Sequence, residues 1–586
     1  MPKPKKIAVV IGVNKTGGLP LLDAATKGAK KFGEWAIQQD YELKLLIDES
    51  KPITLRDIKE AITDCVSSRT YDQLIIYFAG HGILKGPNDE YWLLSNSPDD
   101  TNEAVNVLAS KYLAYESGIP HITFISDACR SVPSDLRITQ VTGGTIFPNL
   151  GPASIQPDID VFYATRPGDA AYEVRDELLT TKGYKGVFTS CMLEGLNGKV
   201  NEIMKEFPDG NPDSVVVYPY ELKQYLHRRV PIATSDVKID LVQQPRIEIT
   251  SRPPKFLSRF KGSGFLGNEE AKRRFGSLSD DFAATQMDIS APLFDIRKVL
   301  NPYDDPKKDI LLNYQLKDLK SASQIDTPPF NTGFIVTGKG EFEVDILPED
   351  IPFDLYEKNY LLPRHHEIEY FPVPQELKFV ILKINDLQGN ERFTPLAVLA
   401  DFVGTILVEN GLVVSINYVP SKNSYRYQQY LMRKEEVEAR RSAVTLASRH
   451  GEFIIGNNPY GLNNLAGYLR SEKALDPTLG LFAAYSYLQK GRHSDIMSVF
   501  EYMYQEQNNL LYDVKLLAAL GNREVVNWPK NISPFCPVLT QGWSYLSLIP
   551  YFDNEKIKAL SAHLVPGLWT TFTNKALPIL RNYFNY

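Results

Sequence analysis

The sequence predicts an α/β fold with a mainly parallel sheet flanked by helices, followed by a mixed β-rich segment and an α-helical C-terminal region. In the first 250 residues, apolar runs rich in Val and Ile alternate with helical patterns. This order is typical of a parallel sheet with helices on both faces. From residue 331 strand patterns dominate, and from residue 424 the pattern is helical. In parallel sheets with helices on both faces, ligands bind at the carboxyl ends of the strands.

The first region contains five short apolar runs that predict its strands, at 6–13, 42–48, 72–80, 121–128 and 158–165. Helices are expected at 24–38, 54–65 and 215–230, with a closing strand within 237–250. Two connections, 131–157 and 173–186, are polar or rich in Pro and Gly. Loops of this length in a compact domain are usually functional or disordered, and we expect activation to order one or both so that they complete a substrate groove.

Changes of composition predict four parts of the chain. They are a first domain at 1–250, a connector at 251–330, a β-rich part at 331–423 and a helical part at 424–586. Within the β-rich part a helix is expected near 394–409, and one long helical segment is expected from Tyr425 to Arg449. We find no fixed-period repeat in the helical part.

Composition limits the class of protein. A chain of 586 residues is long enough for several domains, and its net charge of −7 gives no indication of direct nucleic-acid binding or a membrane partner. The apolar start, IAVVIGV, is too short to span a membrane and is expected to be a strand. The sequence therefore predicts a cytoplasmic protein. Four cysteines make no disulfide framework or metal spacing, and Cys65, Cys191 and Cys536 are expected to be buried apolar residues.

Two motifs follow neighbouring predicted strands. YFAGHG places His81 after the third strand, and ISDACRS places Cys129 after the fourth. A thiol is only slightly ionised at neutral pH, so a nucleophilic cysteine needs an imidazole beside it, which can later protonate the leaving amine. The amides of Gly82 and Cys129 could then form an oxyanion hole. Either residue alone would be read as packed and inert, but the pair in these contexts, 48 residues apart, favours a catalytic dyad.

Residues 1–250 resemble the caspase-like peptidase domain shared by caspases, metacaspases and many bacterial proteases. The opening strand, YFAGHG, SDACRS, VFYATRPGDAAYE and GVFTSCMLEGL occur in the family's order. The resemblance implies a cysteine endopeptidase that acts on protein or peptide substrates, with Cys129 as nucleophile and His81 as base. The later part of the chain resembles no family that we can name.

The departures from the caspase pattern concern the substrate pocket. Asp127 stands where caspases have Gln, and Glu173 stands where they have the Arg that binds a substrate Asp. Two carboxylates would instead favour Arg or Lys before the cleaved bond, as in metacaspases. A third acidic residue of related families aligns with Gly28, and Asp23 is close to it. The alternative is that Asp127 caps a turn and Glu173 is solvated.

The C-terminal region is expected to control such a protease. The resemblance implies a sensor in a bacterial antiviral or cell-death system, activated by a partner protein or a nucleotide second messenger. No cofactor is expected, although calcium or a nucleotide as activator stays open. Arg130 and Arg137 are candidate self-cleavage sites in or near the first loop. The competing hypotheses are an inactive caspase-like scaffold and a helical adaptor that act through protein–protein contacts.

The remaining histidines carry less information. His121 begins a strand and is expected to be structural. His365 and His366 lie in a loop-like PRHHE segment with no third ligand nearby, so the sequence predicts no metal site.

Overall fold

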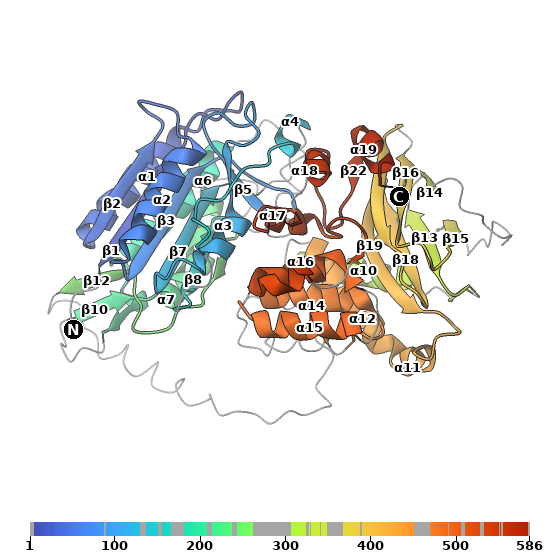
Figure 1. The fold of residues 1–586 in the computed structure, drawn as a ribbon. Helices are drawn as coiled ribbons and strands as arrows, with labels where there is room; N and C mark the ends of the chain where they lie inside the picture. The colour runs from blue at the N-terminus through green and yellow to red at the C-terminus, as the bar shows by residue number, and fades with distance from the viewer. Residues whose placement is uncertain are drawn as a thin grey trace.

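The computed structural model in Figure 1 places two regions side by side, one from each half of the chain. It describes residues 5–86, 89–128, 130, 136–150, 155–165, 181–207, 214–236, 243–261, 306–323, 327–328, 330–339, 342–347, 367–386, 389–449, 469–470, 472–489, 491–505, 510–527, 532–549, 551–552 and 555–583.

A six-stranded sheet forms the centre of the N-terminal region, in the order β11-β8-β7-β3-β1-β2. Its strands are β1 (Lys6–Gly12), β2 (Tyr41–Ile47), β3 (Gln73–Gly80), β7 (His121–Ala128), β8 (Asp158–Tyr163) and β11 (Arg246–Glu248). All neighbours are parallel except β11, which runs antiparallel to β8 at the edge. The five predicted strands and the α/β class are therefore confirmed.

Helices cover both faces of this sheet because its strands are apolar on both sides. Val10 and Tyr77 belong to one buried cluster, and Val9 and Ile76 belong to another on the opposite face. The first cluster packs under α1 (Asp23–Gln38), α6 (Thr181–Leu196) and α7 (Pro219–Asp236), and the second under α2 (Leu55–Ser68) and α3 (Val107–Ala114). This alternation follows from the two-residue period of a strand.

Two small sheets extend the region. One consists of β4 (Gly82–Leu84), β5 (Glu90–Leu93) and β6 (Ala104–Asn106), and the other of β9 (Met204–Glu206), β10 (Ser214–Val217) and β12 (Ser258–Lys261). The helix expected from residue 215 therefore begins later, because its Val-rich start is β10. The loop expected at 173–186 overlaps α6, and the described part of the first loop contains the short helix α4 (Leu136–Thr139).

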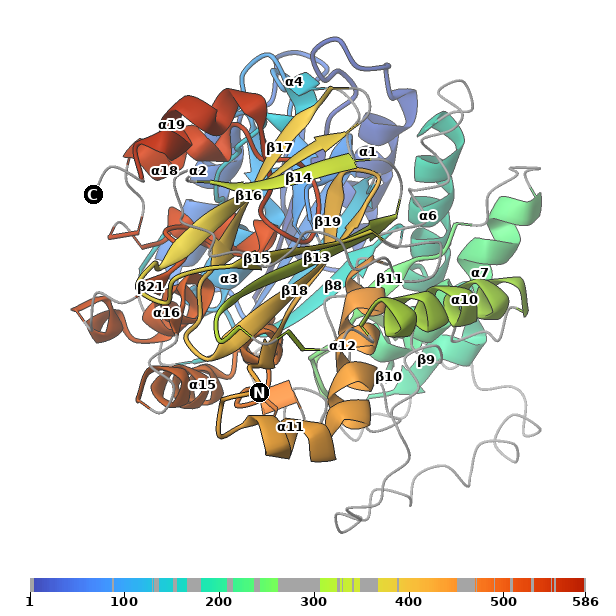
Figure 2. The same ribbon diagram turned by 90° about the vertical axis from the view of Figure 1, so that its right-hand side faces the viewer.

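The C-terminal region contains two four-stranded sheets, β15-β13-β18-β19 and β14-β16-β17-β22. Their strands are β13 (Gly333–Lys339), β14 (Phe342–Leu347), β15 (Glu367–Pro372), β16 (Phe379–Asp386), β17 (Glu391–Ala397), β18 (Phe402–Glu409), β19 (Leu412–Pro420) and β22 (Phe572–Thr573). Because β22 pairs with β17, the predicted β-rich and helical parts share a sheet. Figure 2 shows both sheets in front of the N-terminal region.

Helices surround these sheets. They include α10 (Pro306–Ser323), α11 (Tyr427–Met432), α12 (Lys434–Arg449), α14 (Pro477–Gln489), α15 (His493–Gln505), α16 (Tyr512–Gly521), α17 (Trp543–Leu546), α18 (Glu555–Ser561) and α19 (Leu577–Arg581). The long helix expected from Tyr425 to Arg449 is two helices that meet at Arg433. The expected connector contains the helix α10.

The helix expected near 394–409 is wrong, since β17 and β18 occupy that stretch. Asp401 between them has a φ of 63°, a left-handed conformation that ends one strand and starts the next. Both strands lie in the interior of a sheet, where β17 pairs with β16 and β18 pairs with β13 and β19. Pairing with strands on both sides has overridden the helix-forming Ala and Leu residues of this stretch.

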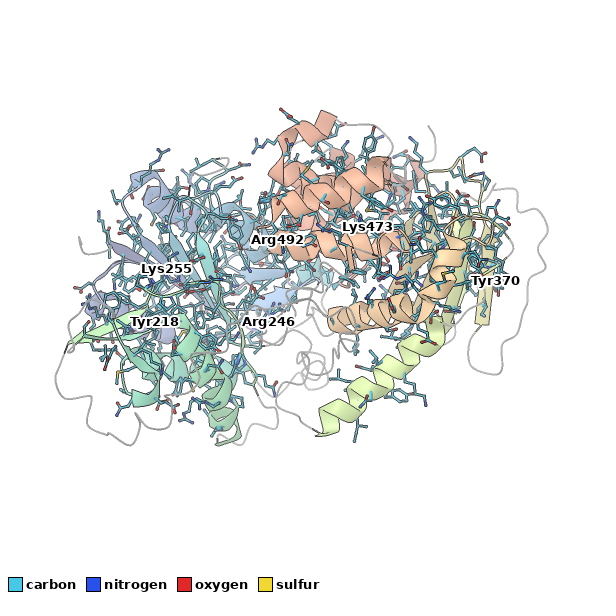
Figure 3. All side chains as sticks on the ribbon, turned by 90° about the horizontal axis from the view of Figure 1, so that it is seen from below. Tyr218, Arg246, Lys255, Tyr370, Lys473 and Arg492 are labelled. Carbon is cyan, nitrogen blue, oxygen red and sulfur yellow. The ribbon has the colours of Figure 1, made fainter. Side chains whose placement is uncertain are left out.

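The two regions share a buried junction, which Figure 1 shows around α17 and Figure 3 shows from below. Seen from below, Arg246 and Lys255 mark the N-terminal region, and Lys473 and Tyr370 the C-terminal one. Tyr112 on α3 donates to the carbonyl of Leu520 at 2.9 Å, and its ring meets that of Tyr545 edge-on. One apolar cluster runs continuously across this junction. Among the described residues, no helix combines the length and apolar character needed to cross a bilayer.

Candidate active site

The motifs identified in the sequence follow two adjacent strands. β3 and β7 pair in parallel with Gly80 opposite Ala128, the last residue of each strand. His81 comes directly after the first and Cys129 directly after the second. Cys129 itself lies outside the described residues. The register therefore brings the two motifs to the same carboxyl edge of the sheet, where ligands bind in folds of this kind.

His81 is largely buried, and its ring orientation is fixed by a backbone contact. Its Nε2 lies 2.8 Å from the carbonyl oxygen of Pro20, in the loop between β1 and α1. A carbonyl oxygen only accepts hydrogen bonds, so Nε2 carries the proton. In the neutral ring Nδ1 is then the basic nitrogen, which is the one that would take up a proton from a nucleophile.

Glycines flank His81, and the one before it is required for steric reasons. A Cβ on Gly80 would lie 2.5 Å from Cζ of Phe78, which is closer than real Cβ atoms approach. Gly82 begins β4, where it pairs with Trp92 of β5. This pairing makes the residues after His81 one strand of a short antiparallel hairpin formed by β4 and β5. The predicted oxyanion role of the Gly82 amide stays a prediction.

Asp127 is buried on β7, one residue before the strand ends, with 1% of its surface exposed. Thr189 of α6 donates its hydroxyl hydrogen bond to the Asp127 carboxylate, and Tyr77 Oη lies 2.7 Å from the same hydroxyl. Burial and the negative charge of Asp127 raise the pKa of Tyr77 well above its usual value. Tyr77 therefore stays protonated and donates to Thr189, which orders a chain of donors that ends on Asp127.

Arg130, the residue after Cys129, is also buried. Its Nε lies 2.9 Å from Glu90 Oε2, and its guanidinium stacks on the Tyr163 ring at 4.0 Å from the ring centroid. The other oxygen of Glu90 accepts from Trp92 Nε1 at 2.8 Å and from Ser126 Oγ at 2.6 Å. Burial raises the pKa of Glu90, and these charged and polar partners oppose the rise. A buried carboxylate with three such partners fixes the side chain of Arg130, the residue after the predicted nucleophile.

The other predicted site residues have mixed outcomes. Glu173 lies outside the described residues, as do His365 and His366. Asp23 is the first residue of α1, and its side chain lies outside the description.

The two candidate self-cleavage sites differ in accessibility. Cleavage after Arg130 disagrees with this arrangement, because a side chain paired inside the protein cannot enter a protease pocket. Arg137 is exposed on α4 and stays a candidate self-cleavage site.

Sequence reasoning missed Glu90, Thr189, Tyr77 and the Pro20 carbonyl. The sequence could have indicated Glu90, because it precedes the apolar run YWLL in a strand. A carboxylate buried there needs a partner. Nothing in the sequence indicated the partner itself, 40 residues away. A backbone carbonyl such as that of Pro20 leaves no signal in residue type.

The residues expected to be structural are confirmed. Cys65, Cys191 and Cys536 are buried free thiols. His121 is buried at the amino end of β7, with Nε2 2.8 Å from Asp160 Oδ2 and Nδ1 3.1 Å from Gln73 Nε2. In the described part of the chain, no three His, Cys, Asp or Glu side chains gather as a metal site would require.

Comparison with known proteins gives the class. Residues 5–209 match the family model of the caspase domain, peptidase family C14. Among solved structures, caspase-1 from Spodoptera frugiperda is similar over 44% of this chain and 90% of that chain, at 12% identity and a TM-score of 0.28. A search of curated proteins found no match.

The chain therefore contains a caspase-like segment within a mixed α/β fold, and this segment includes five strands of the six-stranded sheet. A caspase domain supports a function of the cysteine-peptidase type, with proteins or peptides as substrates.

Proposed function

We propose that the protein is a cysteine endopeptidase that cuts after Arg or Lys, with Cys129 as nucleophile and His81 as base. The observation that carries the proposal is the parallel register of β3 and β7, which supports a meeting of the two motifs at one edge of the sheet. The Pro20 carbonyl supports the role of His81, because it selects the tautomer whose Nδ1 accepts a proton.

The chemistry follows from these groups. His81 Nδ1 takes the thiol proton, and the Cys129 thiolate attacks the substrate carbonyl carbon. The amides of Gly82 and Cys129 would stabilise the oxyanion that forms. The protonated imidazole then gives its proton to the leaving amine, which leaves a thioester on Cys129. Water, deprotonated by His81, hydrolyses the thioester and restores the thiol.

The preference for Arg or Lys rests on Asp127 and Glu173, with Asp23 as a third candidate. Asp127 supports it as a buried carboxylate at the predicted pocket, kept in place by the hydroxyl of Thr189. A carboxylate in such surroundings favours a guanidinium or ammonium partner and rejects a substrate Asp.

Control by the C-terminal region is part of the proposal. A cytoplasmic protease, acting as a bacterial antiviral or cell-death effector, would be switched by a nucleotide second messenger, calcium or a partner protein that binds this region. The support is the buried junction between the two regions, since a regulator must contact what it regulates.

A panel of fluorogenic peptides ending in Arg, Lys or Asp tests the proposal. The wild-type protein and Cys129→Ala are compared with nucleotides, calcium or cell extract added. We expect cleavage after Arg and Lys that is absent from Cys129→Ala. Cleavage after Asp alone contradicts the pocket assignment but not the nucleophile. Failure of an Arg-bearing peptide electrophile to label Cys129 under every condition favours the inactive scaffold.

A further inference from the structure

Strand β5 presents its side chains to two different parts of the molecule. Glu90 and Trp92 face the parallel sheet, where the Trp92 ring stacks on Phe78 with the centroids 4.7 Å apart. Tyr91 faces the other way and lies against the C-terminal region. Side chains alternate along a strand, so a single residue step separates the two environments.

The contact between this part of the chain and the C-terminal region is centred on the hydroxyl group of Ser544. Ser544 of α17 donates to Asp89 Oδ1 at 2.5 Å, and Tyr91 Oη lies 3.0 Å from Ser544 Oγ. Asn106 donates to Tyr91 Oη at 3.1 Å. Since the proton of Ser544 goes to Asp89, Tyr91 donates to Ser544, and the hydrogen bonds run in one direction from Asn106 to Asp89.

This hydroxyl matters because Asp89 is buried. Burial raises the pKa of Asp89 to about 7, and the hydrogen bond from Ser544 acts against that rise. Without Ser544 the carboxyl group would lose a donor in a place where water does not replace it. The contact therefore constrains both partners, although 455 residues separate them in the chain.

On the other side, Ser544 is held by the helices of the C-terminal region. The preceding residue, Trp543, donates from Nε1 to Thr570 Oγ1 at 2.9 Å. Asp513 on α16 accepts from Tyr485 Oη of α14 and from the backbone amides of Val538 and Leu539. A shift of α14 or α16 would therefore move the segment that leads into α17.

A second contact reaches the same hairpin. The amide of Gly567 donates to the carbonyl of Lys85 at 2.9 Å, just beyond the end of β4. β4 starts at Gly82, directly after His81. The C-terminal region thus contacts both sides of the hairpin that follows the predicted base.

Glu90 completes the connection. It follows Asp89 in the chain and holds Arg130, the residue after Cys129, at 2.9 Å. A displacement of Asp89, the residue before β5, changes the position of Glu90, because the two share a peptide bond. The buried ion pair then transmits that displacement, since a guanidinium in the interior follows its carboxylate partner.

We propose that β5 couples the C-terminal region to the nucleophile: Ser544 fixes Asp89 and Tyr91, and Glu90 acts as a positioning residue that holds the Arg130 segment next to Cys129. This inference rests on the proposed function, because it names the route by which the C-terminal region controls the catalytic site. It predicts that a single hydroxyl far from the dyad determines how well the dyad is arranged.

The first test measures the connection without activity. Hydrogen–deuterium exchange is followed in the full chain for Ser544→Ala, Glu90→Gln and the control Tyr112→Phe. The control also removes a hydroxyl that bonds across the junction, but that hydroxyl bonds to the carbonyl of Leu520 and not to β5. We expect Ser544→Ala and Glu90→Gln to raise exchange in 121–128 about tenfold, the effect of one buried hydrogen bond left unmade. Tyr112→Phe should leave 121–128 unchanged.

The second test measures the thiol. Alkylation of Cys129 by iodoacetamide, a small reagent that needs no specificity pocket, is followed by mass spectrometry as a function of pH. We expect Ser544→Ala and Glu90→Gln to change the rate and its pH profile, and Tyr112→Phe to match the wild type.

The outcomes separate the two ideas. If Ser544→Ala behaves like Tyr112→Phe in both tests, the coupling is wrong and the protease assignment stands. If exchange in 121–128 responds but Cys129 is never labelled by an Arg-bearing electrophile, the coupling stands and the proposed function fails. A response that stops within β5 also overturns the coupling.

Discussion

The parallel sheet carries a buried histidine at each of its two edges, and their surroundings differ. At the amino edge, His121 has side-chain partners on both ring nitrogens, one of them the carboxylate of Asp160. At the carboxyl edge, Nε2 of His81 bonds to the uncharged carbonyl of Pro20. The amide of Gln73 and the carboxylate of Asp160 hold both ring nitrogens of His121, whereas the carbonyl of Pro20 holds Nε2 of His81 and orients that ring. Both histidines are buried, so the hydrogen-bond partner of the ring, and not its burial, distinguishes the structural histidine from the candidate base.

The strongest test of this comparison removes the candidate base. His81→Ala should lower peptide cleavage by about 10²–10⁴-fold, because the proposed acceptor of the thiol proton is removed. The melting temperature should change little, since one backbone hydrogen bond is lost. Cleavage kinetics and calorimetry check the two statements, and an active His81→Ala protein would remove His81 from the mechanism.

The next test asks whether Asp127, at the carboxyl edge of the sheet, determines the preference for a substrate Arg. Asp127→Asn keeps an acceptor for Thr189 but removes the negative charge. We expect the preference for Arg over neutral residues to fall about 10- to 100-fold, the size of a lost charge-assisted hydrogen bond. Competition between Arg and Gln peptides measures it. An unchanged preference would mean that Asp127 only supports α6.

A substitution at the amino edge of the sheet should lower the stability of the protein and leave its catalytic activity unchanged. His121→Ala leaves Asp160 and Gln73 without their ring partner, at a cost of about 1–3 kcal/mol in the free energy of unfolding. Urea denaturation gives the loss. Activity per folded molecule should match the wild type, and a large loss of kcat with no loss of stability would contradict the structural role.

The smallest expected effect is a pH dependence. Burial opposes ionisation of Asp160, but the hydrogen bond and charge of His121 and the donors from Ser251 outweigh it and lower the pKa of Asp160 below 3.8. A lowered pKa in the folded state adds stability above the unfolded value of 3.8 and loses it as the pH falls through the folded value. Asp160→Asn should therefore cost most at neutral pH and progressively less below pH 4. Melting temperatures between pH 3 and pH 7 measure the difference.

Much of the N-terminal fold could be predicted because its strands are buried on both faces, and such strands are continuous apolar runs. The runs ending at Gly80 and Ala128 also located the candidate site. In the C-terminal region β17 and β18 each have one distant partner, β22 and β13, and their Ala and Leu residues suggested a helix. For the same reason the partner of Arg130 could not be predicted, since nothing local in the sequence joins β5 to the end of β7.

The position of Ser544 late in the chain has a consequence for synthesis on the ribosome. Asp89 leaves the ribosome 455 residues before Ser544 does. At 5–20 residues per second, Asp89 would wait roughly 20–90 s for the contact from α17. A newly made copy therefore passes through an interval in which its hairpin lacks the restraint that every finished copy carries.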